Sequence, residues 1–182
     1  MNRIFIGLAG LHLIAMCVAA ELGTLVAANG ARSDWMMWHW HAGFWTSLLT
    51  LLVHSIVLTY FVGTGRWVRE VGTVYGFDGV WVRRTWRTKL HAIPLIVASM
   101  LMAVVTAALG ASVDPGSTVR LESWMGIPAA HLHRYSAIAL FLVNLVSYWF
   151  EYAALRANAT TISEVMEQVE RVRRGAVARS PV

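Results

Sequence analysis

The sequence predicts an all-α integral membrane protein: a four-helix bundle with both termini in the cytoplasm, followed by a cytoplasmic amphipathic C-terminal helix. Three observations support this fold class. Of the 182 residues, 57% are hydrophobic and only 14% are charged, far from the average of soluble domains. The charged residues fall between or beyond four long apolar runs. Basic residues are concentrated on one side of those runs.

Each of the four apolar runs is long enough to cross a hydrocarbon core of about 30 Å. The predicted spans are about 4–28, 37–62, 90–111 and 127–152, which form one bundle over residues 1–156. The segment Gly63–Lys89 mixes tryptophans with arginines and is expected to lie along the membrane surface. Residues 157–182 are predicted as the amphipathic helix, with a frayed end after Gly175, because apolar residues recur there at helical spacing. No internal repeat is apparent.

The distribution of arginine sets the expected orientation. The N-terminus, Gly63–Lys89 and the C-terminal tail carry most of the basic residues, so these segments are placed in the cytoplasm. A bacterial cytoplasmic (inner) membrane is the expected location, with the lipid bilayer as the first partner. Other membrane subunits or a second copy of the chain are further candidate partners. The net charge of +5 reflects topology, so no nucleic-acid partner is expected.

Two histidines are predicted at the same depth in neighbouring helices. His12 lies about eight residues from the cytoplasmic start of the first helix, and His54 about eight residues from the cytoplasmic end of the second, roughly 12 Å inside. An ionisable side chain at that depth is costly unless it is paired or ligated, which indicates a functional site. Gly43, Ser47 and Thr50 share the face of His54 and are expected to line the bundle interior.

A second group of histidines is predicted near the outer interface. His39 and His41 open the second helix, and His131 and His133 open the fourth. Helical geometry points His133 inward and favours His39 over His41 as its partner, although an irregular helix start would allow either.

Two layers of inward histidines in a four-helix bundle resemble the small dihaem b-type membrane cytochromes, the cytochrome b561-like proteins. In that family, histidines on different helices ligate two haems stacked across the membrane, and electrons pass to or from quinone. The resemblance implies haem b, with His12 and His54 holding an inner haem and His133 holding an outer haem together with His39 or His41. It implies an electron-transfer function with quinone as the expected redox partner. Neutral imidazole is a good axial ligand for such a cofactor.

Two other classes of function stay open. A ligand set suited to copper is offered by the thioether and imidazole groups of Met36, Met37, His39, His41, His131 and His133. The chain is alternatively an accessory, non-catalytic subunit of a larger membrane complex, with the histidines as hydrogen-bonded packing residues. Hydrolytic enzymes are disfavoured, because the sequence has no HExxH, GxSxG or glycine-rich phosphate loop.

Two smaller expectations concern individual side chains. Glu21 and Glu151 are predicted near opposite interfaces, where they would snorkel to water or take part in proton or quinone chemistry. Leu49 and Val53 are expected to lean toward lipid or a different neighbour, away from the His54 face.

Overall fold

The computed structural model describes residues 1–77 and 79–177, so the predicted frayed end beyond 177 lies outside the described residues. The elements in order are α1 (Asn2–Asn29), α2 (Asp34–Tyr75), α3 (Val80–Lys89), α4 (Ala92–Val113), β1 (Ser123–Trp124), β2 (Ile127–Pro128) and α5 (Ala129–Val177). The two short strands pair with each other in antiparallel orientation. Apart from them the architecture is helical, which confirms the predicted all-α class.

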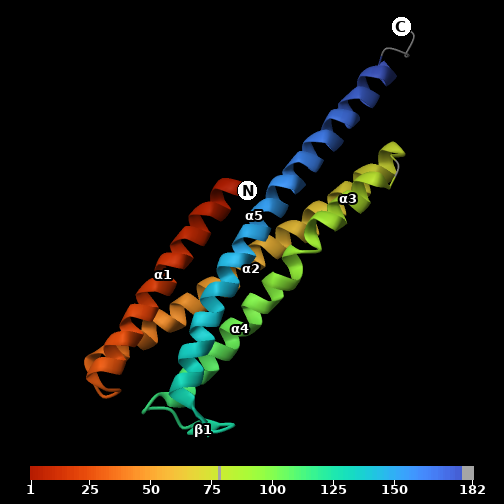
Figure 1. Cartoon of the computed structure of the whole chain (residues 1–182). Coiled ribbons are helices and arrows are strands. Elements are labelled where there is room, and N and C mark those ends of the chain that lie inside the picture. The colour runs from red at the N-terminus through yellow and green to blue at the C-terminus, as the bar shows by residue number, and fades with distance from the viewer. Residues whose placement is uncertain (78, 178–182) are drawn as a thin grey trace.

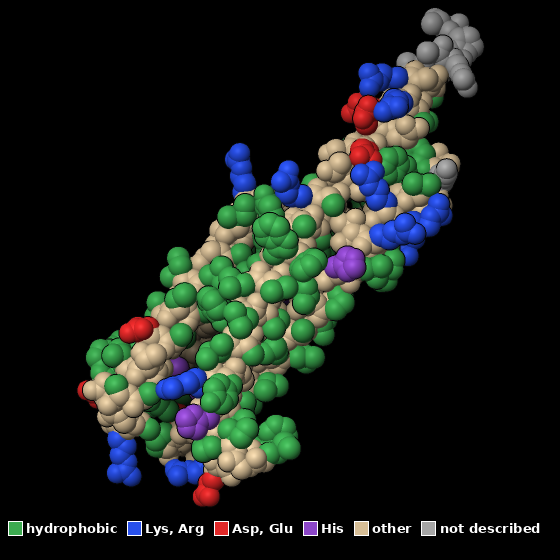
Figure 2. All heavy atoms as spheres, in the orientation of Figure 1, with side chains coloured by type: hydrophobic (Ala, Val, Ile, Leu, Met, Phe, Trp, Pro, Cys, Tyr) green, Lys and Arg blue, Asp and Glu red, His purple; other side chains and the backbone are tan. Residues whose placement is uncertain are grey.

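Four helical segments of the described chain are long and apolar enough to cross a membrane: α1, α2, α4 with the adjoining α3, and α5. The first three contain the predicted spans 4–28, 37–62 and 90–111, and α5 contains the predicted span 127–152 except for its first two residues, which form β2. Hydrophobic side chains cover the middle of the face seen in Figure 2, and charged side chains gather toward its two ends. On this face, the apolar middle is covered neither by charged groups nor by other described parts of the chain.

The helices form two antiparallel hairpins, α1 with α2 and α4 with α5 (Figure 1). Residues 30–33 close the first hairpin and residues 114–128 close the second, both at the same end of the bundle, here named the hairpin end. At the opposite end, α2 and α5 continue beyond the bundle and α3 packs against both. Residues 63–77, 79–91 and 157–177 make up this part, here named the extension.

The extension corrects two expectations. Gly63–Lys89 does not form a loop along a surface, because α2 runs unbroken to Tyr75 and ends only where Gly76 adopts the left-handed conformation, with φ 64°. The tail after residue 156 is not a separate helix, because α5 continues through it without a break. An ion pair between Arg84 of α3 and Glu164 of α5 joins the two parts of the extension.

The two hairpins are built alike, which corrects the expectation that the chain has no repeat. Buried α1 residues Phe5, Ala9, His12 and Met16 match buried α4 residues Ala92, Ile96, Ser99 and Ala103 at a constant shift of 87 positions. Buried α2 residues Thr50, Val53, His54, Val57 and Phe61 match buried α5 residues Asn144, Ser147, Tyr148, Glu151 and Leu155 at a shift of 94. In the sequence, Val18, Ala20, Leu22, Gly23 and Val26 recur as Val105, Ala107, Leu109, Gly110 and Val113. Both units run in the same direction, so the repeat is parallel.

The hydrophobic core lies where all four bundle helices meet. Its largest cluster contains Phe5, Ala9, Val53, Val57, Phe61, Ala92, Ile96, Tyr148, Ala154 and Leu155. Val53 is only 1% exposed, and Leu49 packs against the same cluster, so of the two expected surroundings, lipid or a different neighbour, lipid does not apply to Val53. The reason is that α2 contacts α1, α4 and α5, which buries a wider stripe than one neighbour would.

Candidate functional site

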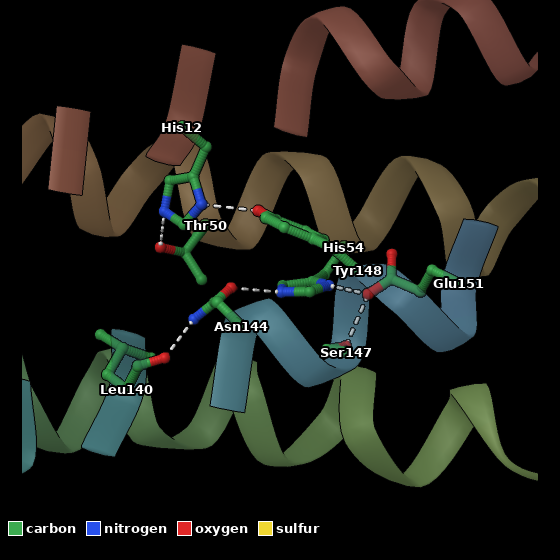
Figure 3. A network of polar contacts seen from close by, with 8 residues as sticks. All are labelled: His12, Thr50, His54, Leu140, Asn144, Ser147, Tyr148 and Glu151. Atoms are coloured by element: carbon green, nitrogen blue, oxygen red, sulfur yellow. Dashed lines mark hydrogen bonds and ion pairs between the residues drawn. The ribbon is translucent and has the colours of Figure 1, made fainter. Parts of the chain in front are cut away.

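A hydrogen-bonded network of polar side chains occupies the middle of the bundle (Figure 3). His12 of α1 and His54 of α2 are both fully buried, as their predicted depth requires. His12 Nε2 lies 2.7 Å from Thr50 Oγ1, and His12 Nδ1 lies 2.5 Å from the Tyr148 hydroxyl oxygen. Because Thr50 donates its own hydrogen to the Thr46 carbonyl, His12 Nε2–H donates to Thr50 and Tyr148 donates to Nδ1. His12 is therefore neutral, with both ring nitrogens engaged.

His54 is held by side chains of α5. Its Nε2 lies 2.9 Å from Asn144 Oδ1, and the amide nitrogen of Asn144 donates to the Leu140 carbonyl at 2.8 Å. The second bond fixes the orientation of the amide, so His54 Nε2 carries a hydrogen. His54 Nδ1 lies 2.9 Å from Glu151 Oε1, and the Ser147 hydroxyl donates to the same oxygen at 2.6 Å. Glu151 is 0% exposed, so its side chain does not snorkel to water as expected.

Tyr148 lies between the two histidines. Its ring stacks on His54 with centroids 5.4 Å apart and meets His12 edge to face at 5.8 Å. An axial haem ligand needs a ring nitrogen with a free lone pair that faces open space. Both nitrogens of His12 and Nε2 of His54 are hydrogen-bonded within the protein, and His54 Nδ1 faces Glu151 Oε1 at 2.9 Å. The inner histidines do not fit haem in this arrangement, and we assign them no metal.

The second histidine pair lies at the hairpin end. His39 Nδ1 of α2 is 3.0 Å from the Ala19 carbonyl oxygen of α1, and His133 Nδ1 of α5 is 3.1 Å from the Thr106 carbonyl oxygen of α4. A carbonyl only accepts, so each Nδ1 carries the hydrogen and each Nε2 carries the lone pair. The two rings lie edge to face with centroids 6.0 Å apart. The structure thus brings His133 together with His39, the partner that ideal helix geometry favoured over His41.

A glycine on the neighbouring helix lets each of these histidines approach closely. A Cβ atom on Gly23 would lie 3.0 Å from His39 Cε1, and one on Gly110 would lie 2.9 Å from His133 Cε1. The two glycines, like the two histidines, are equivalent positions of the repeat. Figure 2 shows the surface hollowed between α1 and α5 near this end, with a histidine side chain inside the hollow.

The donor chemistry of this outer pair fits haem. Among the described residues, no hydrogen bond is recorded for Nε2 of His39 or His133. Metal-ligating histidines commonly donate their other ring N–H to a backbone carbonyl, which fixes the tautomer and the ring orientation. With metal–imidazole bonds of about 2 Å, two rings at this spacing can reach a single ion.

The other candidate copper ligands are dispersed. Met36, Met37 and His41 line an open groove of about 460 Å³ together with Trp40 and Asp114. His131 is exposed and stacks on Tyr135, and His39 and His133 form the inward pair already described. Within residues 1–77 and 79–177, no group of three or more His, Cys, Asp or Glu side chains is placed to hold a metal ion. The six predicted copper ligands therefore fall into three separate places.

A buried lysine at the extension end was missed by sequence reasoning. Lys89 is 3% exposed, and its Nζ donates to the Phe61 carbonyl at 2.6 Å and lies 3.4 Å from Thr64 Oγ1. Asn158 of α5 donates to the same threonine hydroxyl. Lys89 is the single lysine of the sequence. An argument that counts all basic residues of a segment together does not distinguish this lysine from the arginines around it.

Comparisons with protein-family models, with curated proteins and with solved structures find no match. Function is therefore inferred from the contacts of the residues themselves. Among the residues of the network, Tyr148 could not be recognised from the sequence as part of a site. A tyrosine in an apolar helix is typical of packing or of an interfacial belt.

Proposed function

We propose that the chain is an integral membrane protein of the bacterial cytoplasmic membrane, with both termini and the extension in the cytoplasm. The apolar surface of the bundle supports insertion, because exposed side chains such as Ile14, Leu101 and Leu142 would otherwise face water. The basic residues of the extension support the orientation, since cytoplasmic segments carry an excess of lysine and arginine. The immediate partner is then the lipid bilayer.

Site-directed labelling tests this orientation. In a background in which the single cysteine is replaced, Cys17→Ala, we expect Val119→Cys to react with a membrane-impermeant maleimide in intact cells. We expect Arg174→Cys to react only after permeabilisation, because it lies in the extension. Labelling of Arg174→Cys in intact cells, with Val119→Cys protected, would reverse the proposed orientation.

We further propose that the protein is a b-type cytochrome that transfers electrons, with one haem at the hairpin end held by His39 and His133. The observation that carries this proposal is the pair of equivalent Nδ1–H···O=C bonds, which orient two imidazoles with free Nε2 atoms at 6.0 Å between centroids. When bound, the haem would supply one-electron transfer at the iron.

The residues of this chain would tune such a site in three ways. The carbonyls of Ala19 and Thr106 hold the ring orientation and raise the basicity of Nε2. The half-buried position of both rings limits access of water to the iron. Gly23 and Gly110 allow the rings to sit against the neighbouring helices. Quinone remains the expected redox partner.

Optical spectroscopy tests the haem proposal. Protein purified from haem-replete cells is expected to show Soret and alpha bands in reduced-minus-oxidised spectra, and His39→Ala or His133→Ala is expected to abolish them. His12→Leu and His41→Ala are the matched controls and should keep the bands, because neither histidine belongs to the proposed pair.

A colourless preparation, or haem retained in the His39→Ala, His133→Ala double variant, would overturn the assignment. Metal analysis of the same samples separates the alternatives. Stoichiometric copper lost in a Met36→Leu, Met37→Leu, His41→Ala variant would favour metal handling at the outer groove. Absence of both haem and metal would leave the accessory-subunit interpretation.

A further inference from the structure

His54 and Glu151 form a buried ionisable pair whose hydrogen bonding is incomplete. His54 Nε2 carries one hydrogen, which it donates to Asn144. His54 Nδ1 lies 2.9 Å from Glu151 Oε1, yet Nδ1 makes no hydrogen bond to any described residue. The nitrogen of the imidazole that faces the carboxylate is therefore left without a hydrogen-bond partner.

One oxygen of the pair is left without a partner. Glu151 Oε2 is buried and makes no hydrogen bond to any described residue. A buried acceptor without a partner costs about 1–3 kcal/mol, and such atoms are few in native structures. A carboxylate that served only to anchor His54 would not need to leave this oxygen unsatisfied.

The repeat shows that the fold does not require these polar side chains. Val57 is the residue of α2 equivalent to Glu151, and it is also buried, at 1% exposure. Tyr148 is the residue of α5 equivalent to His54. The two hairpins thus agree at the hairpin end, where histidine faces histidine, and differ in the middle, where one half supplies an imidazole and the other a carboxylate.

We propose that His54 and Glu151 form a proton-binding site in the interior of the bundle. An incoming proton bonds to Oε2 of the carboxylate, which is the oxygen free to receive it. Rotation of the carboxyl group presents the proton to His54 Nδ1, where an N–H bond forms as the O–H bond breaks. Release follows the reverse path, leaving a neutral imidazole with Nε2–H and a glutamate carboxylate. The ligand is the proton itself, and no electron changes hands.

The ionisable groups around the pair are bonded to other partners, so none of them shares the proton with His54 and Glu151. His12 of α1 and Tyr148 of α5 face it and are hydrogen-bonded to each other, while α4 has no ionisable residue within Ala92–Val113. From α3, Lys89 bonds to the Phe61 carbonyl, two helical turns from His54 along α2. The empty pair would carry an uncompensated buried negative charge, so arriving positive charge would favour release.

The direction of exchange follows from a second unpartnered acceptor. Asn158 lies two turns beyond Glu151 on α5, is fully buried, and its Oδ1 makes no hydrogen bond within the described part of the chain. Its amide nitrogen donates to Thr64, which adjoins Lys89. These polar groups lie between the His54–Glu151 pair and the extension, so we place proton entry at the end of the bundle that adjoins the extension.

Nitrogen-15 NMR of the wild-type protein in lipid bilayers tests the proposal without a substitution. Val53–His54 is the single Val–His pair of the sequence, so carbonyl-13C valine with uniformly 13C,15N-labelled histidine selects the backbone amide of His54 among seven histidines. Transfer through the labelled carbons of that histidine then reaches its two ring nitrogens. Between about pH 3 and pH 11, a range that brackets ordinary carboxyl and imidazole titration, we expect His54 Nε2 to stay protonated. We expect the Nδ1 signal to shift from protonated to unprotonated in one step.

Two variants provide the controls. Glu151→Gln should abolish the Nδ1 step, whereas Glu21→Gln, which changes an exposed glutamate of α1, should leave it unchanged. An Nδ1 signal that does not move across the range, or an Nε2 without a hydrogen, would overturn the proposal even if Glu151→Gln fails to fold. The experiment reads nitrogen protonation directly, so it is independent of the haem proposal and fails or succeeds separately from it.

Discussion

Replacing Glu151 with leucine is expected to lower the free energy of unfolding by about 3 kcal/mol, because removal of one partner of a buried pair leaves the other buried and unsatisfied. In this protein, His54 Nδ1 would lose its partner, and the Ser147 hydroxyl would lose the oxygen to which it donates. The measurement is the loss of helical circular dichroism during titration of the detergent-solubilised protein with a denaturing detergent.

The double variant His54→Leu, Glu151→Leu is expected to recover most of this loss. Replacement of both partners by apolar side chains leaves no unpaired charge, and Val57 shows that the equivalent position of the other hairpin is apolar. The matched control is Glu21→Leu, which changes an exposed glutamate and should alter stability by no more than about 0.5 kcal/mol. Equal losses in Glu151→Leu and in the double variant would contradict the pairing.

Substitution of Gly110 by leucine is expected to have the second largest effect, a loss of about 1–3 kcal/mol from overpacking. The first carbon of the new side chain would lie 2.9 Å from His133 Cε1, so the imidazole must leave the Thr106 carbonyl or α4 and α5 must separate. The same displacement would move Nε2 of His133, so the haem bands are expected to disappear as well. Gly23→Leu should act in the same way through His39.

Gly10→Leu is the control for these substitutions, because a Cβ atom on Gly10 would meet nothing within 4 Å. Leucine has a higher helix propensity than glycine by a few tenths of a kcal/mol to about 1 kcal/mol, so this control should be neutral or stabilising. Denaturant titration and reduced-minus-oxidised spectra of the three variants check the prediction together. If Gly110→Leu is as stable as Gly10→Leu, the close packing of His133 is not required.

The membrane-crossing segments could be predicted from sequence because hydropathy and segment length determine them directly. The extension could not, because hydropathy marks where a helix would leave the bilayer and not where the helix ends. The chain after Val62 has no residue that stops a helix until Gly76 adopts a positive φ. For the same reason, α5 passes residue 156 without interruption.

At the candidate sites, helical geometry predicted the depth of His12 and His54 and favoured His39 over His41. It could not predict that Tyr148 would lie between the inner histidines, because that depends on the rotation of three helices about their axes. Glu151 stands near the end of an apolar run, and its burial depends on the contact that it makes with His54 of α2, which the sequence does not reveal. The sequence alone does not reveal the repeat, because few residues are identical between the two hairpins. The repeat is evident only when the buried positions of the two hairpins are aligned.

The unbroken course of α5 has a mechanical consequence. At 1.5 Å per residue, its 49 residues form a rod of roughly 70 Å, more than twice the thickness of a hydrocarbon core. The segment that carries Asn144 and Glu151 and the segment that carries Glu164 are parts of this single rod. A tilt imposed on the extension by a soluble protein would act as a lever on the polar groups inside the bundle, and a change of packing there would be amplified as movement of the tail.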